Sequence, residues 1–468
     1  MPLVLGVDSS IHATTVELRD TDDGRLYASG SAPHAPVHAP RAEQDPTTWW
    51  NALVEARHNA GGAFGVAGVA VAAQQHGLVV LDDENRVIRP AKLSIDTEAA
   101  ADAADLVDSF GGSAEWVAAC GSVPAASFSI AKLAWLARAE PESFARVARV
   151  MEPHDWLTYR LSRRAVTDRG DASSTGFWSP RENRWRADLL GLVDDHKDWG
   201  GCLPRVLGPD EPAGDRQGVV IAAGTGETMA AALGLGLRPR DLVISMGEQA
   251  HLFTVRERPT EDASGAVAGF ADATGRFMPM IPVVNGAGVA RSVARLIGVD
   301  ANRFDQLALN APPGADGVTV VPYFQPERTP HAPDASGLVT GLRADVAPEH
   351  LARATIEGIV CGMLDAVNAL RAADVPVGGR LYLIGPAARS HAFQRVLADL
   401  SERPVAVPTG DRAAAGACVQ AAAAVLRQPP DEVAEAWGVN HAREIEPDAR
   451  VDADEIRATY AATRDLRY

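Results

Sequence analysis

The order of predicted elements restarts in the middle of the chain, and this feature most constrains the fold. Near the N-terminus, "LVLGVDSS", "TTVELRD" and "GRLYASGSAP" read as three strands separated by turns. A strand that enters glycines, "GVVIAAGTG", opens a second series near residue 219, and helices then alternate with strands. A chain of 468 residues is too long for one core at roughly 100–200 residues per domain. We therefore predict an α/β protein with two domains, residues 1–218 and 219–468.

Composition narrows the classes of ligand. Apolar residues make up 46% and charged residues 22%, as in globular α/β proteins. The net charge of -17, without any basic run, argues against nucleic acid or an anionic membrane as a partner. A small-molecule ligand agrees better with this composition and net charge than nucleic acid or a membrane does.

Cysteine usage and hydropathy predict the compartment. The four cysteines lie far apart, with neither CxxC nor metal-ligand spacing, so the sequence indicates no disulfide framework and no zinc site. The N-terminus lacks a signal peptide, and no window reaches the roughly 18 apolar residues of a membrane span. We expect a cytoplasmic protein with no membrane partner.

Seven segments together carry a resemblance to a known family. They are "QQHGLVVLDDENRVIRPA", "GSVPAASFSIAKLAWL", "PHDWLTYRL", "VTDRGDASSTGFW", "PYFQPERTP", "GLVTGL" and "LIGPAARS". In order and extent they resemble the FGGY carbohydrate kinases, and within them the bacterial D-xylulose kinases. The resemblance implies two ribonuclease-H-like (actin/hexokinase-type ATPase) domains with an interdomain cleft. The first domain would bind sugar and the second ATP, and a homodimer is possible because dimers are common in the family.

The resemblance implies a sugar pocket in the first domain. Gln75 and His76 in "QQHG" match a loop that reaches substrate hydroxyls, although His76 could also be an ordinary hairpin residue. The family's Trp-Asn-Asp-Thr-Arg segment reads "SIDTE" here, so that Asp96 and Thr97 are kept while the other three positions differ. We expect Gln75, His76, Asp96 and Thr97 to contact substrate.

The resemblance also implies a catalytic base. Glu227 matches the family's catalytic aspartate and Thr228 an asparagine, so we expect Glu227 to act as base and Thr228 to contact substrate. The other interpretation of Glu227 is a carboxylate that caps a helix N-terminus. Glutamate has one methylene more than aspartate, and a displacement on the order of 1 Å can cost about 100-fold in rate.

The family's first phosphate loop, Asp-x-Gly-Thr followed by a cation, is altered. The same place reads "DSSIHATTVE", which keeps Asp8 but has no glycine before Gly24 and has Thr15 in place of the cation. Ser9, Ser10 and His12 are the other residues expected in this altered phosphate loop. In the family the aspartate organises Mg²⁺, so Asp8 is the candidate metal residue. Asp8 could equally be a solvated residue at a strand end.

The second phosphate loop is altered as well. "ISMGEQA" keeps Gly247, whereas Glu248 and Gln249 replace two hydroxyl residues. Two unit negative charges about 4 Å apart repel by about 4 kcal/mol at an effective dielectric near 20, which would weaken phosphate binding about 1000-fold. A metal ion or a proton would have to offset this charge, unless the alignment is shifted by one residue.

The family's adenine turn, Gly-Gly-Gly-x-x-Ser, has also changed. It reads Gly385, Pro386, Ala387 and then Ser390. Pro386 removes an N–H donor, and Ala387 adds a Cβ where adenine or ribose would pack.

Three functions compete at this point. The first is an atypical xylulokinase-type phosphotransferase that acts on a small ketose or polyol with ATP, Mg²⁺ and Glu227 as base. The second is a non-kinase enzyme, of isomerase, cyclase or lyase type, whose acid–base groups would be His12, His76, Asp96, Glu227 and Glu248. The third is a pseudokinase that binds a sugar without catalysis.

Overall fold

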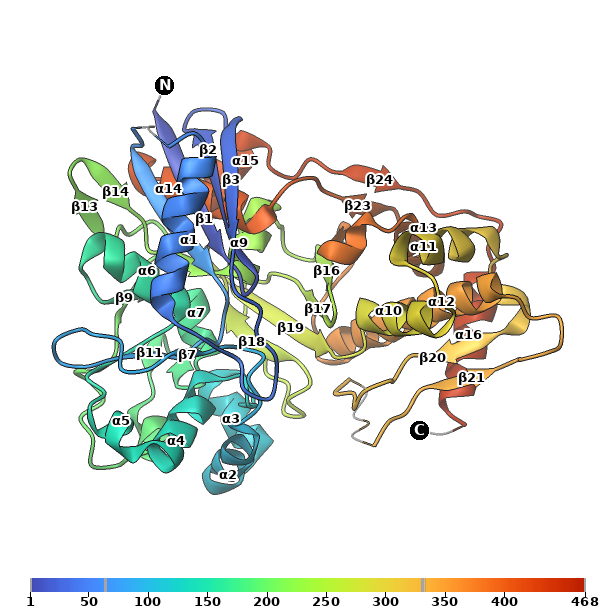
Figure 1. The fold of residues 1–468 in the computed structure, drawn as a ribbon, viewed down its shortest axis with the longest axis horizontal. Coiled ribbons are helices and arrows are strands. Elements are labelled where there is room, and N and C mark those ends of the chain that lie inside the picture. The colour runs from blue at the N-terminus through green and yellow to red at the C-terminus, as the bar shows by residue number, and fades with distance from the viewer. Residues whose placement is uncertain (1, 63–64, 330–331, 333, 467–468) are drawn as a thin grey trace. The chain divides into compact units, whose positions relative to one another are not determined.

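The computed structural model describes residues 2–62, 65–329, 332 and 334–466 (Figure 1). The chain folds into two compact units. Unit 1 consists of Met1–Leu237, Arg256–Met278 and Gly410–His441, and unit 2 of Arg238–Val255, Pro279–Thr409 and Ala442–Tyr468. The chain therefore crosses between the units more than once. The boundary at residue 218/219 stays a prediction.

A mixed sheet forms the centre of unit 1. Its strand order is β13 (Gly214–Arg216), β14 (Val219–Ile221), β5 (Gly68–Ala73), β1 (Leu3–Ser9), β2 (Ala13–Asp20) and β3 (Leu26–Pro33), and β15 (Thr225–Gly226) also pairs with β5. The antiparallel run β1, β2, β3 confirms the meander predicted at the N-terminus. Strands β1, β14 and β15 all run parallel to β5. Because parallel strands end at the same edge of a sheet, the residues that follow β1, β5 and β15 lie close together.

The first helix of unit 1 begins where the sequence predicts. Helix α1 (Pro46–Asn59) starts with proline after the N-cap Asp45, whose side chain accepts a hydrogen bond from the Thr47 N–H. Proline suits this position because its missing N–H would have no partner in the helix, and an N-cap carboxylate satisfies another free donor.

Helices cover both faces of this sheet. A Cβ built on Gly30 would lie 2.2 Å from the Ala56 carbonyl oxygen of α1, and one built on Gly6 would lie 2.3 Å from the Ala414 carbonyl oxygen of α14 (Arg412–Leu426). Gly6 and Gly30 pair with the neighbouring β2 residues Glu17 and Val16, which point to opposite faces. Helices α1 and α14 therefore pack on opposite faces, and glycine at each contact lets the backbones approach closely.

Shorter elements complete unit 1. The strands are β4 (Glu43–Gln44), β6 (Val79–Leu81), β7 (Ala91–Lys92), β8 (Arg149–Met151), β9 (Val166–Asp168), β10 (Trp178–Ser179), β11 (Arg184–Trp185), β12 (Arg205–Leu207) and β18 (Ala268–Ala271). The helices are α2 (Ala100–Phe110), α3 (Ser113–Cys120), α4 (Ser129–Ala139), α5 (Pro141–Ala145), α6 (Pro153–Ser162), α7 (Arg169–Ser174), α8 (Ala187–Gly191), α9 (Glu227–Gly234) and α15 (Pro430–Trp437).

Unit 2 is built on a second mixed sheet. The strands follow the order β19 (Phe277–Val283), β17 (Ala250–Phe253), β16 (Leu242–Met246), β22 (Leu381–Ile384), β23 (Val405–Val407) and β24 (Arg443–Ile445). Strands β16, β22 and β23 are parallel, so the turns after β16 and β22 are neighbours. This order confirms the predicted α/β alternation of the second half.

The other elements of unit 2 surround this sheet or form a small hairpin. They are β20 (Thr319–Val321), β21 (Leu338–Thr340), α10 (Ala287–Leu296), α11 (Ala301–Asn310), α12 (Pro348–Ala372), α13 (His391–Ser401), α16 (Ala453–Arg464) and the 3-10 turns Ala315–Gly317 and Pro386–Arg389. The long amphipathic helix predicted from "PEHLARATIEGIVCGMLDAVNALRAA" corresponds to α12.

Candidate functional site

Acidic and amide side chains meet at the carboxyl edge of the unit 1 sheet. Asp8 lies at the end of β1, Gln75 follows β5, and Glu227 follows β15 as the first residue of α9. Ligand sites of α/β sheets lie outside the carboxyl ends of their strands. The topology thus brings three of the predicted residues to one place.

Burial of the Asp8 carboxylate is energetically unfavourable. It is 9% exposed, and its Oδ1 has no hydrogen-bond partner among the described residues. Burial raises the pKa of Asp8 well above its usual value, and the nearby carboxylates of Asp411 and Glu227 raise it further. An isolated buried carboxylate of this kind favours a proton or a bound cation.

Glu227 has a pKa suited to proton transfer. Burial raises the pKa of Glu227 to about 7, and the negative charge of Asp411 adds to the shift. Its neighbour Thr228 is buried. A carboxyl group with a pKa near 7 exists in both protonation states at neutral pH, as general acid–base catalysis requires.

Asp411 is a site residue that the sequence interpretation missed. It is the N-cap of α14, where its Oδ1 accepts hydrogen bonds from the N–H groups of Ala413 and Ala414. The aspartate before the alanine-rich helix was a signal for this cap. Only the packing of α14 on the sheet shows that its charge acts on Asp8 and Glu227.

Gln75 contributes an unused donor. Its side chain is 7% exposed, and its Nε2 has no hydrogen-bond partner among the described residues. A Cβ added at Gly226 would lie 2.5 Å from the Gln75 Cγ and 2.8 Å from the Asp171 Oδ1. Gly226 therefore lets the amide and the acid pack against the backbone just before Glu227.

His76 is held firmly from several sides. It has a positive φ of 60°, and its Nδ1 lies 2.9 Å from the Ser174 carbonyl oxygen. Its ring lies 4.8 Å from Phe128 and 5.9 Å from Phe270, measured between centroids. The Lys132 ammonium donates a hydrogen bond to the His76 carbonyl oxygen. This support fixes the turn that carries Gln75 and His76.

A buried polar network lies behind Gln75 and Glu227. The His154 Nδ1 and the Asp171 Oδ2 are 2.5 Å apart, and the Thr225 hydroxyl donates to the Asp168 Oδ2 at 2.7 Å. Burial raises the pKa of Asp171 well above its usual value, and the charges of Asp168 and Glu227 raise it further. His154, Asp168 and Asp171 come from "PHDW" and "VTDRGDASSTG", which supported the resemblance but had no assigned role.

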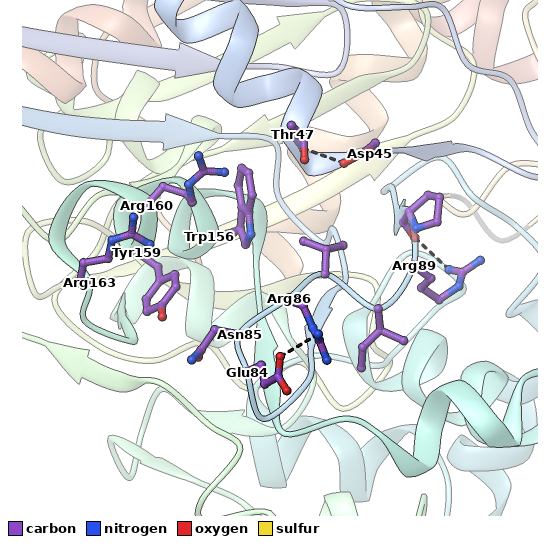
Figure 2. Close-up of a pocket in the computed structure, with 13 residues that line it drawn as sticks. Asp45, Thr47, Glu84, Asn85, Arg86, Arg89, Trp156, Tyr159, Arg160 and Arg163 are labelled. Atoms are coloured by element: carbon purple, nitrogen blue, oxygen red, sulfur yellow. Dashed lines mark hydrogen bonds and ion pairs between the residues drawn. The ribbon is translucent and has the colours of Figure 1, made fainter.

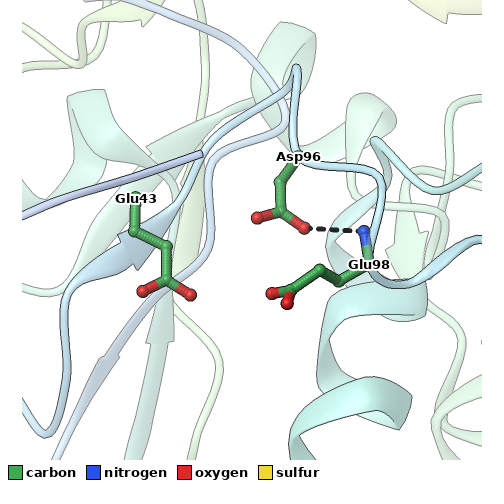
Figure 3. A group of neighbouring side chains, drawn as sticks. All are labelled: Glu43, Asp96 and Glu98. Carbon is green, nitrogen blue, oxygen red and sulfur yellow. Dashed lines mark hydrogen bonds between the residues drawn. The ribbon is translucent and has the colours of Figure 1, made fainter. Parts of the chain in front are cut away.

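Asp96 is fully engaged inside the protein. Its Oδ2 accepts hydrogen bonds from the Ala42 N–H at 2.9 Å and the Lys92 Nζ at 3.0 Å, and its Oδ1 accepts one from the Glu98 N–H at 3.1 Å. Glu43, Asp96 and Glu98 place carboxylate oxygens within 4.8 Å of one another (Figure 3). Lys92 is fully buried and also pairs with Glu98 at 2.5 Å and Glu43 at 3.3 Å. An ammonium group therefore supplies the positive charge that three clustered carboxylates require.

The remaining predicted residues of unit 1 lie in two turns. Ser9 bonds to the Thr14 hydroxyl at 3.2 Å, and the Ser10 hydroxyl donates to the Ala13 carbonyl oxygen at 3.1 Å. His12 is exposed in the same turn, and Thr97 is exposed with its N–H donating to the Pro40 carbonyl oxygen. The side chains of Ser9 and Ser10 thus close the β1–β2 hairpin in the absence of a glycine.

The turn after β16 carries a charge pair. Gly247 donates its N–H to the Gln249 carbonyl oxygen at 2.9 Å, and both Glu248 and Gln249 are exposed. The Glu248 carboxylate forms an ion pair with Arg291 of α10. The Glu248 charge that the sequence brings to this turn is therefore balanced within unit 2.

The turn after β22 adjoins the turn after β16. Gly385 has a φ of 86°, and a Cβ there would lie 2.8 Å from the Met246 carbonyl oxygen. Pro386 and Ala387 lie in the short helical turn that follows. The Ser390 hydroxyl accepts the Phe393 N–H at the start of α13 and donates to the Asp305 carboxylate. The two predicted nucleotide segments thus follow neighbouring parallel strands, although Pro330 of "PYFQPERTP" lies outside the described residues.

This combination defines a class of protein. One α/β unit holds a carboxyl group with a pKa near 7 beside buried polar groups without partners, and the other holds two glycine turns after adjacent parallel strands. Such an arrangement is typical of sugar kinases with the actin/hexokinase-type ATPase fold.

The chain belongs to the FGGY family of carbohydrate kinases. The N-terminal domain model of that family matches residues 3–234, and the C-terminal domain model matches residues 242–425. A xylulose kinase of Streptomyces rubiginosus is 40% identical over 447 residues, which cover 93% of this chain and 91% of that protein. A xylulose kinase of Streptomyces coelicolor has the same identity and coverage.

Solved structures agree with this assignment. The xylulose kinase of Bifidobacterium adolescentis matches with a TM-score of 0.86 and 33% identity over 99% of each chain. A glycerol kinase of Plasmodium falciparum shares the fold, with a TM-score of 0.86 at 16% identity over 100% of this chain and 97% of that one. The chain is a xylulokinase-type sugar kinase by family, and none of these matches supports the non-kinase enzyme or the pseudokinase. Within the described residues, every helix is too short or too polar to cross a bilayer.

Proposed function

We propose that this protein transfers the γ-phosphoryl group of ATP to a hydroxyl group of a small ketose of the xylulose type. The observation that carries the proposal is the Glu227 carboxyl group, with a pKa of about 7, at the carboxyl edge of the unit 1 sheet. The 40% identity to two xylulose kinases supports the choice of sugar class.

Glu227 is the general base of this proposal. In its ionised form it accepts the proton of the attacking sugar hydroxyl as the O–P bond forms. Burial, together with the negative charge of Asp411, raises the pKa of Glu227, and a higher pKa makes the carboxylate a stronger base. The extra methylene of glutamate moves the carboxylate relative to an aspartate, so the sugar must bind in a correspondingly shifted position.

Sugar recognition is assigned to the neighbouring polar groups. Gln75 offers an unused N–H donor, and His76 is fixed by the Ser174 carbonyl oxygen and by Phe128. Thr228 adds a hydroxyl group next to Glu227. Asp96 and Thr97 are assigned to support the sugar site, because Asp96 accepts a hydrogen bond from Ala42 and Thr97 donates one to Pro40, which fix their loop.

The residues present fit an ATP–Mg²⁺ complex. Asp8 has a buried Oδ1 without a partner and lies near the Asp411 and Glu227 carboxylates, and Mg²⁺ prefers such oxygen ligands. Asp8 is the residue assigned to hold the metal, which neutralises phosphate charge when bound. The turns at Gly247 and Gly385 are assigned to the nucleotide, and Arg291 offsets the Glu248 charge that would otherwise repel phosphate.

The expected cellular compartment and binding partners agree with a sugar kinase. All four cysteines are buried free thiols, which agrees with the reducing cytoplasm where ATP and sugars are available. Besides ATP and Mg²⁺, the expected partner is a small sugar or polyol-like ligand, and neither nucleic acid nor a membrane is expected. A homodimer stays a prediction.

The test is direct measurement of phosphoryl transfer. Purified protein is incubated with ATP, Mg²⁺ and D-xylulose, D-ribulose or D-fructose, and ADP and sugar phosphate are quantified separately. We expect a ketose-dependent release of ADP matched by an equal amount of sugar phosphate. The variant Glu227→Gln should lose this activity, whereas Glu55→Gln, on the exposed side of α1, should retain it.

The proposal fails if no ketose raises ADP release and neither ATP nor ADP raises the melting temperature. Stabilisation by a ketose without any turnover would instead establish the pseudokinase.

A further inference from the structure

A cavity of unit 1 lies away from the candidate site. It has a volume of about 630 Å³, and its lining residues come from α1, the end of α6 and the β13–β14 hairpin. Figure 1 labels these elements. Its lining includes Gly65 and Val66, which precede β5, and Val219 at the start of β14. These positions mark the amino-terminal edge of the parallel strands, whereas Asp8 and Glu227 lie at the carboxyl edge. We call this space the α1–α6 cavity, and its size is typical of small-molecule sites.

The inner wall of the α1–α6 cavity is apolar. Leu5 of β1, Leu53 of α1, Val69 of β5 and Ile221 of β14 line it, and each is at most 6% exposed. Val54 lies nearer the mouth with 53% of its surface exposed. A ligand with an apolar body would remove this surface from water.

The mouth of the same cavity carries only positive charge. Arg57, Arg160, Arg163 and Arg216 line it, and none of its described lining residues is an aspartate or glutamate. This is unusual in a protein with a net charge of -17. Within the described part of the chain, Arg160, Arg163 and Arg216 form no ion pair with a carboxylate, and the Arg216 side chain donates a hydrogen bond to the Leu161 carbonyl oxygen at 3.2 Å. Arginine offers several N–H donors in a fork that matches carboxylate or phosphate groups.

Arg160 is held in place by aromatic rings. Its guanidinium lies 4.6 Å from the Trp50 ring centroid and 5.1 Å from that of Trp156. Figure 2 shows a neighbouring pocket, which Asp45 and Glu84 also line, and in it Arg160 of α6 lies beside Trp156. Burial and the positive charge of Arg163 lower the pKa of Arg160. Ring contacts orient a guanidinium while leaving its N–H edge available.

We propose that the α1–α6 cavity binds an amphipathic organic anion, with a carboxylate or phosphate head at Arg160 and Arg163 and an apolar body against Leu53 and Val69. This site does not depend on the proposed kinase activity, because it lies at the other edge of the sheet. The apolar wall excludes a simple inorganic ion as the best ligand, and the arginine mouth excludes a neutral or cationic amphiphile.

Decanoate and octyl phosphate serve as probes in titration calorimetry of the full-length protein. We expect saturable binding of at least one of the two at one site, and at least tenfold weaker binding of 1-decanol, acetate and inorganic phosphate. The two probes distinguish a carboxylate head from a phosphate head. Equal binding of 1-decanol, or no binding of either probe, would overturn the proposal.

The arginines are tested with a matched control. Arg163 is the αL residue that ends α6, and Arg427 is the αL residue that ends α14 but does not line the cavity. Arg163→Gln, alone or with Arg160→Gln, should weaken probe binding at least tenfold, whereas Arg427→Gln should leave it unchanged. Val54→Asp keeps every arginine but places a carboxylate at the mouth, and should also weaken binding tenfold. Unchanged binding in folded Val54→Asp and Arg163→Gln proteins would contradict the proposal.

Discussion

Glu248 in the turn after β16 forms an ion pair with Arg291 of α10. In the sequence, Glu248 replaces a hydroxyl residue of a phosphate loop and would repel phosphate. The structure supplies a guanidinium on the same carboxylate, from a helix whose role at this turn the sequence did not indicate. The pair is exposed, so its effect on overall stability is small, and its relevance is to charge at the turn.

Removal of Arg291 should weaken nucleotide binding. Arg291→Gln leaves the Glu248 charge unbalanced, and we expect the Kd for ATP–Mg²⁺ to rise about tenfold at low salt, since nearby exposed charges are only partly screened. Glu248→Gln should lower the Kd. Titration calorimetry at low and high salt measures both, with Arg295→Gln on the same helix as the control. Equal affinities in all four proteins would show that this turn does not meet phosphate.

Changes at Glu227 should act on catalysis more than on sugar binding. Glu227→Gln keeps the shape but cannot accept a proton, so we expect kcat to fall about 10²- to 10⁴-fold. Glu227→Asp withdraws the carboxylate by one methylene and should lower kcat about 100-fold. Steady-state kinetics, together with ketose-induced shifts in melting temperature, separate the two effects. A Glu227→Gln protein with full kcat would remove Glu227 from the mechanism.

His251 should make the protein sensitive to acid. Burial lowers the pKa of His251 to about 4, from an ordinary value of 6.5. Below pH 6.5 the unfolded chain takes up a proton that the folded protein excludes, so the free energy of unfolding falls as pH drops towards 4, by roughly 2–3 kcal/mol. Above pH 6.5 this loss is absent.

The variant His251→Gln cannot titrate at this position. Its melting temperature should therefore fall less than that of the wild type between pH 6.5 and 4.5, while His58→Gln, exposed on α1, should follow the wild type. If the melting temperatures of wild type and His251→Gln fell equally with pH, His251 would not be the group that makes the protein sensitive to acid.

Gly416 permits the close contact of α14 with α9. A Cβ at Gly416 would lie 1.8 Å from the Ala230 carbonyl oxygen, which is backbone and cannot move aside alone. We expect Gly416→Ala to lower the free energy of unfolding by about 3 kcal/mol or more, measured by urea unfolding. Gly191→Ala is the control, because a Cβ there meets nothing within 4 Å, and it should be neutral or slightly stabilising. Similar stabilities of the two variants would argue against the tight helix pair.

The sequence determined the elements and much of the site's composition. Alternating apolar residues and turn glycines predicted β1 to β3, and the N-cap aspartate with proline predicted the start of α1. These features are local, because side-chain periodicity and backbone preference act over a few residues. The pairing of β1 and β15 with β5, which is tertiary, then brings Asp8, Gln75 and Glu227 to one edge.

The tertiary structure decided which charges meet. Asp411 acts on Glu227, Arg291 pairs with Glu248, and Lys92 joins Asp96 to two glutamates. The strong shift in the pKa of Glu227 depends on burial and on a charge brought in by α14. Neither can be read from spacing, since desolvation and Coulomb interaction depend on distances in space that only the packed helices and sheets set.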